Sequence, residues 1–247
     1  MTSTYHAQFQ VTDEFLDENH QLKTSALLYF VQEVSGQHAT VLGTGWDALQ
    51  EKHLFWAIIR HRVRITRLPM AGETVTLETW PMPTTRVAYP RATVAYDEDG
   101  CELFRTTALW VLMDTETRAM VLPARSGVTV EGILTGNELE APGSLSPKEL
   151  SQTVPHQVTE AELDRNQHMN NTRYMDWIDS LLLGDFRKEH PMQEFTVCYL
   201  SEARKGQSLE LCWELSGEQV LSVEVQRPKD DESGKTERIF AAGVVFS

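Results

Sequence analysis

The sequence has few basic residues and no long hydrophobic segment. Only 22 Lys and Arg stand against 36 Asp and Glu in 247 residues, which gives a formal net charge of −14. Nucleic acids and anionic membranes are bound through clustered basic surfaces, so both are disfavoured as partners. No apolar run approaches the roughly 18 residues of a membrane-spanning helix, and the first residues do not form a signal-peptide pattern. We therefore expect a soluble, cytoplasmic protein that binds neither nucleic acid nor membrane.

Cysteine and the common cofactor motifs are also scarce. The three cysteines are far apart and suit a reducing compartment, and Cys198 in its apolar segment is best interpreted as a small buried thiol. There is no CxxC pair and no HExxH spacing among the eight histidines, so no metal site is expected. Nucleophile-elbow, Walker and dinucleotide-binding glycine motifs are absent as well. The sequence thus predicts a protein without metal or cofactor.

The sequence does contain one internal repeat. Residues 16–19 (LDEN) correspond to residues 163–166 (LDRN), and residues 71–77 correspond to residues 205–211 at a shift of 205 − 71 = 134. After each LDxN motif, apolar residues recur at helical spacing, which predicts an amphipathic helix in each half. The candidate N-caps are Thr24 or Ser25 for the first helix and Asn170 or Asn171 for the second.

Strand patterns follow each helix. Apolar and polar residues alternate over residues 209–215 and 221–225, which is typical of half-buried strands. Residues 123–153 are rich in Gly, Pro and Ser and are interpreted as a linker. We therefore predict an α+β protein with an N-terminal unit over residues 1–122 and a C-terminal unit over residues 154–247, in which two helix-on-sheet units join as a covalent pseudo-dimer.

The most unusual polar stretch lies directly before the second helix. Asp164, Asn166, His168 and Asn170 occupy alternate positions, so an extended chain would place them on one face near a helix N-terminus. A carboxylate, an amide and an imidazole in that arrangement can orient water and move a proton. The alternative is that Asp and Asn serve only as helix-capping residues.

Comparison of the two copies favours the catalytic interpretation. The first copy keeps the Asp and Asn of the motif, but it has Gln21 where the second copy has His168. A single active site on a duplicated scaffold would produce that difference. A second candidate is Glu202, which ends an apolar strand and would suit a general base at the edge of an apolar pocket. Its alternative role is that of a solvated residue at a strand end.

With these residues in view, the chain resembles the acyl–acyl-carrier-protein thioesterases of plants and bacteria. The resemblance covers most of the chain and is carried by residues 54–60 (LFWAIIR), 72–75 (GETV), 109–118 (LWVLMDTETR) and 164–174 (DRNQHMNNTRY). It implies two tandem hotdog folds, each a long helix wrapped by a curved antiparallel sheet, with acyl binding in the N-terminal unit and catalysis in the C-terminal unit. It also implies hydrolysis of fatty acyl–acyl carrier protein, which releases free fatty acid and terminates fatty acid synthesis.

The resemblance implies that the family's catalytic Asp, Asn, His and Glu correspond to Asp164, Asn166, His168 and Glu202. Plant members have a Cys directly after that Glu, whereas this chain has Ala203, so attack by water is expected in place of a cysteine nucleophile. We expect Glu202 to activate the water. His168 and the backbone amides near Asn170 and Asn171 would stabilise the oxyanion, and direct attack by Asp164 stays open.

Three alternatives to hydrolysis of acyl–acyl carrier protein stay open at this point. They are an acyl-coenzyme A thioesterase, a hotdog dehydratase and a non-catalytic acyl-binding module. An acidic carrier protein as partner calls for a basic surface, and the one candidate is an arginine stripe formed by Arg60, Arg62, Arg64 and Arg67. A solvated strand face explains the same arginines. The chain is expected to act as a monomer or a homodimer.

Overall fold

The computed structural model describes residues 3–164, 168–182, 186–217, 219–229 and 235–247. The chain divides into two compact units, Met1–Pro142 (unit 1) and Gly143–Ser247 (unit 2). Each unit consists of an antiparallel sheet and one principal helix, so the predicted α+β class is confirmed. No helix in these ranges is both long and apolar enough to span a membrane.

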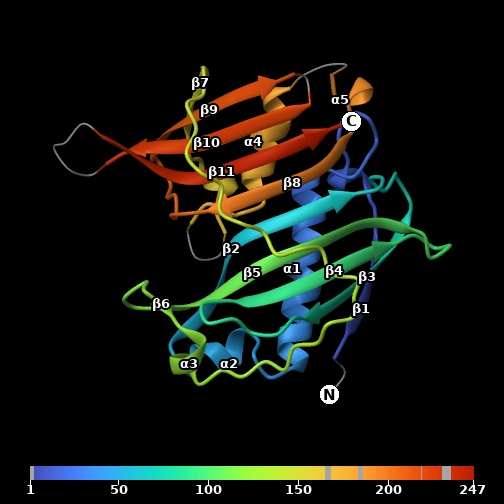
Figure 1. Ribbon diagram of the computed structural model, residues 1–247, viewed down its shortest axis with the longest axis vertical. Helices are drawn as coiled ribbons and strands as arrows, with labels where there is room; N and C mark the ends of the chain where they lie inside the picture. Colours follow the sequence, from blue (N-terminus) through green and yellow to red (C-terminus); the bar gives the residue numbers. More distant parts are fainter. Residues whose placement is uncertain (1–2, 165–167, 183–185, 218, 230–234) are drawn as a thin grey trace. The chain divides into compact units, whose positions relative to one another are not determined.

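Unit 1 is built on a sheet with the strand order β1-β3-β4-β5-β2, to which the short β6 adds by pairing with β5 (Figure 1). Every pair in this sheet is antiparallel. The strands are β1 (Tyr5–Gln10), β2 (Leu54–Ile65), β3 (Thr74–Pro81), β4 (Tyr89–Tyr96), β5 (Glu102–Asp114) and β6 (Met120–Val121). The helices are η1 (Asp13–Phe15), α1 (Thr24–Val41), α2 (Trp46–Gln50) and α3 (Pro123–Ser126).

Unit 2 repeats this plan with the strand order β8-β11-β10-β9-β7. Its strands are β7 (Gln152–Gln157), β8 (Met192–Tyr199), β9 (Ser208–Ser216), β10 (Val220–Pro228) and β11 (Thr236–Phe246). Its helices are η2 (Glu160–Glu162), α4 (Arg173–Leu181) and α5 (Phe186–Glu189). The repeat read from the sequence is therefore a repeat of structure, since each strand of the unit 2 sheet has a counterpart at the same place in unit 1, where β6 is additional.

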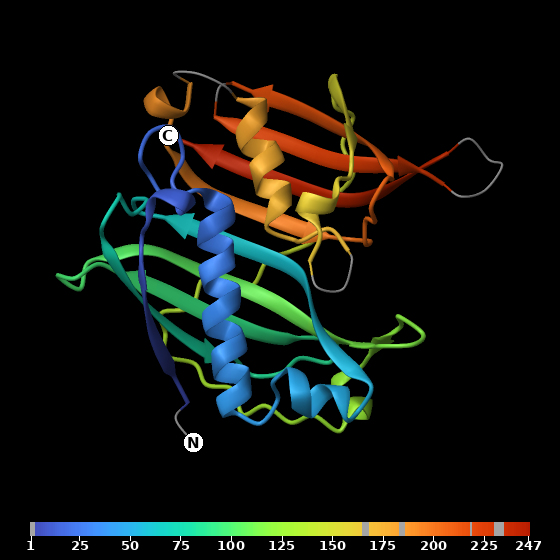
Figure 2. The ribbon, with the colours of Figure 1, turned by 180° about the vertical axis from the view of Figure 1, so that it is seen from behind.

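In each unit the principal helix lies across one face of the sheet, α1 in unit 1 and α4 in unit 2 (Figure 2). Most of the apolar positions predicted for α1 are buried, among them Leu27, Val31 and Val34, whereas Leu42 is the half-buried C-cap. Burial of these side chains removes apolar surface from water, which stabilises the helix on the sheet. Thr24, one of the expected N-caps, is instead the first residue of the helix, and Lys23 occupies the cap position.

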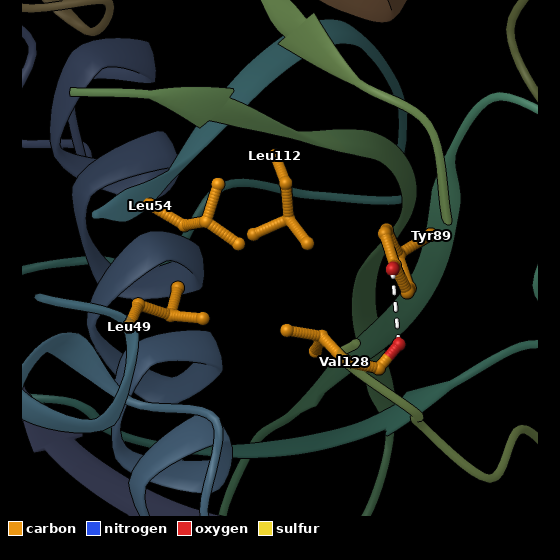
Figure 3. Close-up of a cluster of buried hydrophobic side chains, with 5 residues drawn as sticks. All are labelled: Leu49, Leu54, Tyr89, Leu112 and Val128. Atoms are coloured by element: carbon orange, nitrogen blue, oxygen red, sulfur yellow. Dashed lines mark hydrogen bonds between the residues drawn. The ribbon is translucent and has the colours of Figure 1, made fainter. Parts of the chain in front are cut away.

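A second core cluster of unit 1 gathers between α2, β2, β4 and β5. Figure 3 shows the side chains of Leu49, Leu54, Leu112 and Val128 pointing toward a common centre. Tyr89 closes the cluster, and its hydroxyl donates a hydrogen bond of 3.1 Å to the carbonyl oxygen of Val128. The segment that follows α3 is therefore part of the core of unit 1.

The segment of residues 123–153 is ordered along the outer faces of the sheets. In unit 1, the hydroxyl of Thr107 donates to the carbonyl of Leu139 at 2.6 Å. In unit 2, the backbone N–H of Lys148 donates to Glu224 at 3.0 Å, and Arg238 contacts the same carboxylate at 2.8 Å. Glu224 is consequently buried, although alternation along β10 had predicted an exposed side chain.

Candidate active site

The candidate site lies at the start of α4 in unit 2. Two hydrogen bonds join Asp164 and His168: the Asp164 N–H donates to the His168 carbonyl at 2.7 Å, and the His168 N–H donates to Asp164 Oδ1 at 3.2 Å. They therefore do not share the face of one extended strand, as the alternating pattern had suggested. The predicted Asn166 lies outside the described residues. Asp164 acts here by fixing the backbone that carries His168.

The fold brings His168 and Glu202 together. The His168 ring Nε2 lies 3.4 Å from Glu202 Oε2. A backbone hydrogen bond of 2.9 Å from Met169 N–H to the Ala203 carbonyl and a β-bridge between His168 and Arg204 hold the two segments side by side. The His168 side chain is 16% exposed and that of Glu202 is 41% exposed. Glu202 is thus open to water and does not lie inside an apolar pocket.

Arg227 on β10 fixes the turn that carries Glu202. Its guanidinium donates to the Glu202 carbonyl at 2.7 Å and to the Ser201 hydroxyl at 3.0 Å. It also forms an ion pair of 3.1 Å with Glu237. This positioning role was missed in the sequence, where Arg227 is one polar residue in a strand, and no local pattern marks it.

Asn170 and Asn171 precede α4, but the prediction that one of them is its N-cap is wrong, because Thr172 occupies that position. The two asparagines also differ in their hydrogen bonds. The Asn170 side chain accepts hydrogen bonds from the N–H and hydroxyl of Thr172, both at 3.0 Å, in the manner of a capping residue. The Asn170 N–H already donates to the Glu162 carbonyl at 2.8 Å. The Asn171 carbonyl accepts a bond of 3.1 Å from the Tyr199 hydroxyl. Of the two backbone N–H groups, that of Asn171 is the better candidate for an oxyanion.

Glu162 connects η2 to α4, next to the candidate site. Its carboxylate accepts bonds from the Trp177 indole at 2.7 Å and from Thr159, and it lies 3.0 Å from His156. Burial acts to raise the pKa of Glu162, but the hydrogen bonds from Thr159 and Trp177 outweigh it and lower that pKa below its usual value. A charged Glu162 therefore ties η2 to α4.

The equivalent place in unit 1 has the same backbone and different chemistry. Asp17 N–H donates to the Gln21 carbonyl at 2.8 Å, and Gln21 N–H donates to Asp17 Oδ1 at 3.0 Å. Gln21 stands at the position of His168, and Leu68 stands at the position of Glu202 (202 − 134 = 68). The Asp is therefore a structural element of both copies, whereas the His and Glu pair is found only in unit 2.

The described residues do not place a cysteine nucleophile beside His168 and Glu202. Cys198 on β8 is buried and its thiol is 3.8 Å from the Gly143 carbonyl. Ala203 follows Glu202, and its carbonyl is used by Met169. A water molecule activated by the His and Glu pair is thus the nucleophile that these residues can supply.

The predicted arginine stripe lies on and after β2 in unit 1. Arg60, Arg62 and Arg64 alternate along the strand, and Arg62 is 3.5 Å from Glu140. Arg67 is held by Glu73 at 2.8 Å and by Asp97 at 3.0 Å, and the hydrogen bond to Glu73 raises its pKa further. Its charge is therefore compensated within unit 1.

Solved structures with the same architecture define the class of fold. An acyl-ACP thioesterase from Bacteroides thetaiotaomicron matches with a TM-score of 0.81 at 21% identity, over 99% of this chain and 98% of that one. The 12:0-ACP thioesterase from Umbellularia californica matches with a TM-score of 0.80 at 20% identity, over 100% and 98%. The fold is the hotdog fold, which confirms the expectation from the sequence.

Sequence relatives point the same way. Oleoyl-acyl carrier protein thioesterase 1 of Arabidopsis thaliana is 24% identical over 82% of this chain, which spans 61% of that relative. Dodecanoyl-[acyl-carrier-protein] hydrolase of Cinnamomum camphora is 26% identical over 78% of this chain and 54% of the relative. The chain thus spans little more than half the length of these curated relatives.

Family profiles cover most of the chain. The profile of the acyl-ACP thioesterase N-terminal domain matches residues 2–123, and that of the C-terminal domain matches residues 145–240. The chain therefore belongs to the acyl-ACP thioesterase family.

Proposed function

We propose that this protein hydrolyses the thioester of fatty acyl–acyl carrier protein and releases the free fatty acid. The observation that carries the proposal is the contact of 3.4 Å between His168 and Glu202. The chain belongs to this family, and of its two copies of the loop only the one in unit 2 has the His and Glu pair. The free state of Cys101, Cys198 and Cys212 supports a cytoplasmic setting. The acyl carrier protein is the proposed partner.

The chemistry needs one base and one site for negative charge. Glu202 accepts a proton from a water molecule, and the resulting hydroxide attacks the thioester carbon. His168 and the Asn171 N–H donate to the oxyanion that forms. The intermediate then expels the thiolate, a good leaving group that takes up a proton. Asp164 keeps the His168 backbone in place through the two hydrogen bonds described above, which supports an orienting role and not direct attack.

The two units divide the work in this proposal. Residues 154–247 carry the catalytic pair, and residues 1–122 bind the acyl chain. The loss of the His and Glu in unit 1, with its loop otherwise retained, supports a binding role for that unit. Docking of the acidic carrier is assigned to Arg60, Arg62 and Arg64, while Arg67 is committed to Glu73 and Asp97.

The test measures free fatty acid by mass spectrometry after incubation with matched acyl–acyl carrier protein and acyl-coenzyme A. We expect hydrolysis of the carrier-protein thioester, with Glu202→Gln and His168→Ala each slowing it by roughly 10²–10⁴-fold. Gln21→Ala, at the position equivalent to His168 in unit 1, is the control and should keep full activity.

Three results would go against this proposal. Near-normal turnover in both variants would remove the assigned roles. Preference for coenzyme A would make the protein an acyl-coenzyme A thioesterase. Binding of acyl groups without release of acid by the wild-type protein would leave an acyl-binding module.

A further inference from the structure

The helix-facing layer of unit 1 contains a cluster of polar side chains that the catalytic chemistry does not use. Arg91 on β4 reaches α1, where its guanidinium Nη1 lies 3.0 Å from His38 Nδ1. Residues paired directly across antiparallel strands have their side chains on the same face. Arg91, Ala108 and His61 form one such row, and Thr79, Thr93, Thr106 and Val63 form the next. We call His38, His61, Thr79, Arg91, Thr93 and Thr106 the polar layer.

These groups are almost completely buried. Arg91 is 8% exposed, and the other members of the polar layer are 1% exposed or less. Arg91 Nη1 also donates to Thr79 at 3.3 Å, and the Thr93 hydroxyl donates to Thr79 at 2.9 Å. In the described part of the chain, no carboxylate forms a hydrogen bond or ion pair with Arg91. A buried guanidinium without a counter-charge is unfavourable, and it attracts any oxygen ligand that reaches it.

One ring nitrogen of His61 is buried without a hydrogen-bond partner. Its Nε2 is bonded to the Thr106 hydroxyl, whereas its Nδ1 is buried and has no hydrogen-bond partner. Burial lowers the pKa of His61 to about 3, so the ring is neutral at physiological pH. Ala108 lies between His61 and Arg91 in the row, and its methyl group occupies the least room of any side chain there. The unpaired nitrogen and the guanidinium therefore flank a small residue.

Unit 2 shows that the fold does not need this polarity. By strand register, the counterparts of His61 and Arg91 are Val197 and Val223, which both flank Ala242 as His61 and Arg91 flank Ala108. The next row of unit 2 is likewise apolar and consists of Leu211, Val225 and Phe240. All of these residues are buried. An apolar layer is thus sufficient for the fold of unit 2. In unit 1, the buried guanidinium and the unpaired imidazole nitrogen lower stability unless a ligand contacts them.

We propose that the polar layer of unit 1 binds an oxygen atom on the acyl chain, so that the protein favours acyl groups with a hydroxyl, oxo or carboxylate substituent over plain chains. The inference rests on the proposed function, since it assumes that unit 1 receives the acyl group. The catalytic pair belongs to unit 2, so the oxygen recognised here is a substituent of the chain and not the thioester carbonyl. Arg91 donates to it, and His61 Nδ1 completes the contact as donor or acceptor.

The test measures binding without turnover. Acyl-pantetheine amides of equal carbon number, either plain or carrying a hydroxyl, oxo or carboxylate group, are titrated by calorimetry into the wild-type protein. We expect at least one oxygenated amide to bind roughly ten- to a hundredfold more tightly than the plain one. His61→Val and Arg91→Val, which install the residues of unit 2, should reduce that ratio to about one.

A matched pair of variants separates recognition from folding. Thr106 and Thr107 are adjacent, both buried, and each forms a hydroxyl hydrogen bond, but Thr106 faces the polar layer and Thr107 bonds Leu139 on the outer face. Thr106→Val should lower the oxygenated-to-plain ratio, and Thr107→Val should leave it unchanged. Equal binding of all four amides by the wild type, or a ratio untouched by His61→Val, Arg91→Val and Thr106→Val, would overturn the inference. Because amides need no hydrolysis, that failure is separate from a failure of the proposed reaction.

Discussion

A single buried imidazole makes the stability of unit 1 sensitive to acid. Burial lowers the pKa of His61 to about 3 from its ordinary value of 6.5. Because the unfolded state binds the proton more tightly, the stabilisation from neutral His61 is complete above pH 6.5 and is lost as the pH falls toward 3. The same layer contains the charged group of Arg91, whose own pKa burial lowers to about 10.

At the residue scale we predict that His61→Val flattens the acid limb of the stability profile. Between pH 7.5 and 5.5 the wild type should lose about 1.4 kcal/mol of unfolding free energy through this histidine alone. Urea unfolding at several pH values measures the free energy of unfolding of the wild type and of His61→Val. Carboxylates that titrate equally in both proteins do not contribute to the difference between them. Parallel profiles for the two proteins would show that folding does not lower the pKa of His61.

At the scale of elements, the duplicated turns show which geometry is structural and which serves the site. Gly72 and Gly206 both adopt φ +80, and their N–H groups donate at 2.9 Å to the carbonyls of Val11 and Val158, respectively. Neither has any atom within 4 Å of an added Cβ, so the penalty for a side chain comes from the backbone alone. Near Gly206, the Gln207 side chain accepts from Arg204 N–H at 2.9 Å and from Arg227 at 3.3 Å.

We therefore predict equal effects on stability and unequal effects on activity for Gly72→Ala and Gly206→Ala. Each should lower the unfolding free energy by about 1–2 kcal/mol, because an L-residue is strained in the left-handed region. Only Gly206→Ala should also slow hydrolysis several-fold, since it disturbs the contacts that hold Arg227 against Glu202. Thermal unfolding and initial rates on the same samples decide this. Similar rates for both variants would place the turn of unit 2 outside the site.

At the scale of the whole molecule, the charge of −14 conceals local pairing of the basic residues. Arg62 lies near Glu140, Arg67 bonds two carboxylates, and Arg105 is paired with Glu102. Surface ion pairs of this kind are weak and screened by salt, so an acidic partner can compete for the arginines on β2.

We predict that Arg62→Glu combined with Arg64→Glu raises KM several-fold for acyl–acyl carrier protein and weakens its salt dependence, with kcat unchanged. The same double variant should treat acyl-pantetheine, which has no carrier protein, like the wild type. Steady-state kinetics at several ionic strengths measure both substrates. An unaltered KM for the carrier substrate would move the docking surface away from β2.

The sequence by itself determined much of this protein, because periodicity and spacing are local properties. It predicted the duplication, the α+β class, the strands β9 and β10 and the segment that carries His168. It also proposed Glu202, first from its place at the end of an apolar strand and then through the family pattern. Hydrophobic spacing of helix and strand is visible in one chain without any knowledge of contacts.

Only the tertiary structure decided which distant residues meet. Strand register placed Glu202 beside His168, Arg227 behind Glu202, and Arg91 in one row with His61. It also buried Glu224, because a segment far away in sequence covers that face of β10. A one-residue shift in register would send the side chains of a strand to the other face, so these contacts depend on how strands far apart in the sequence pair. The site of unit 2 and the polar layer of unit 1 are therefore products of long-range pairing.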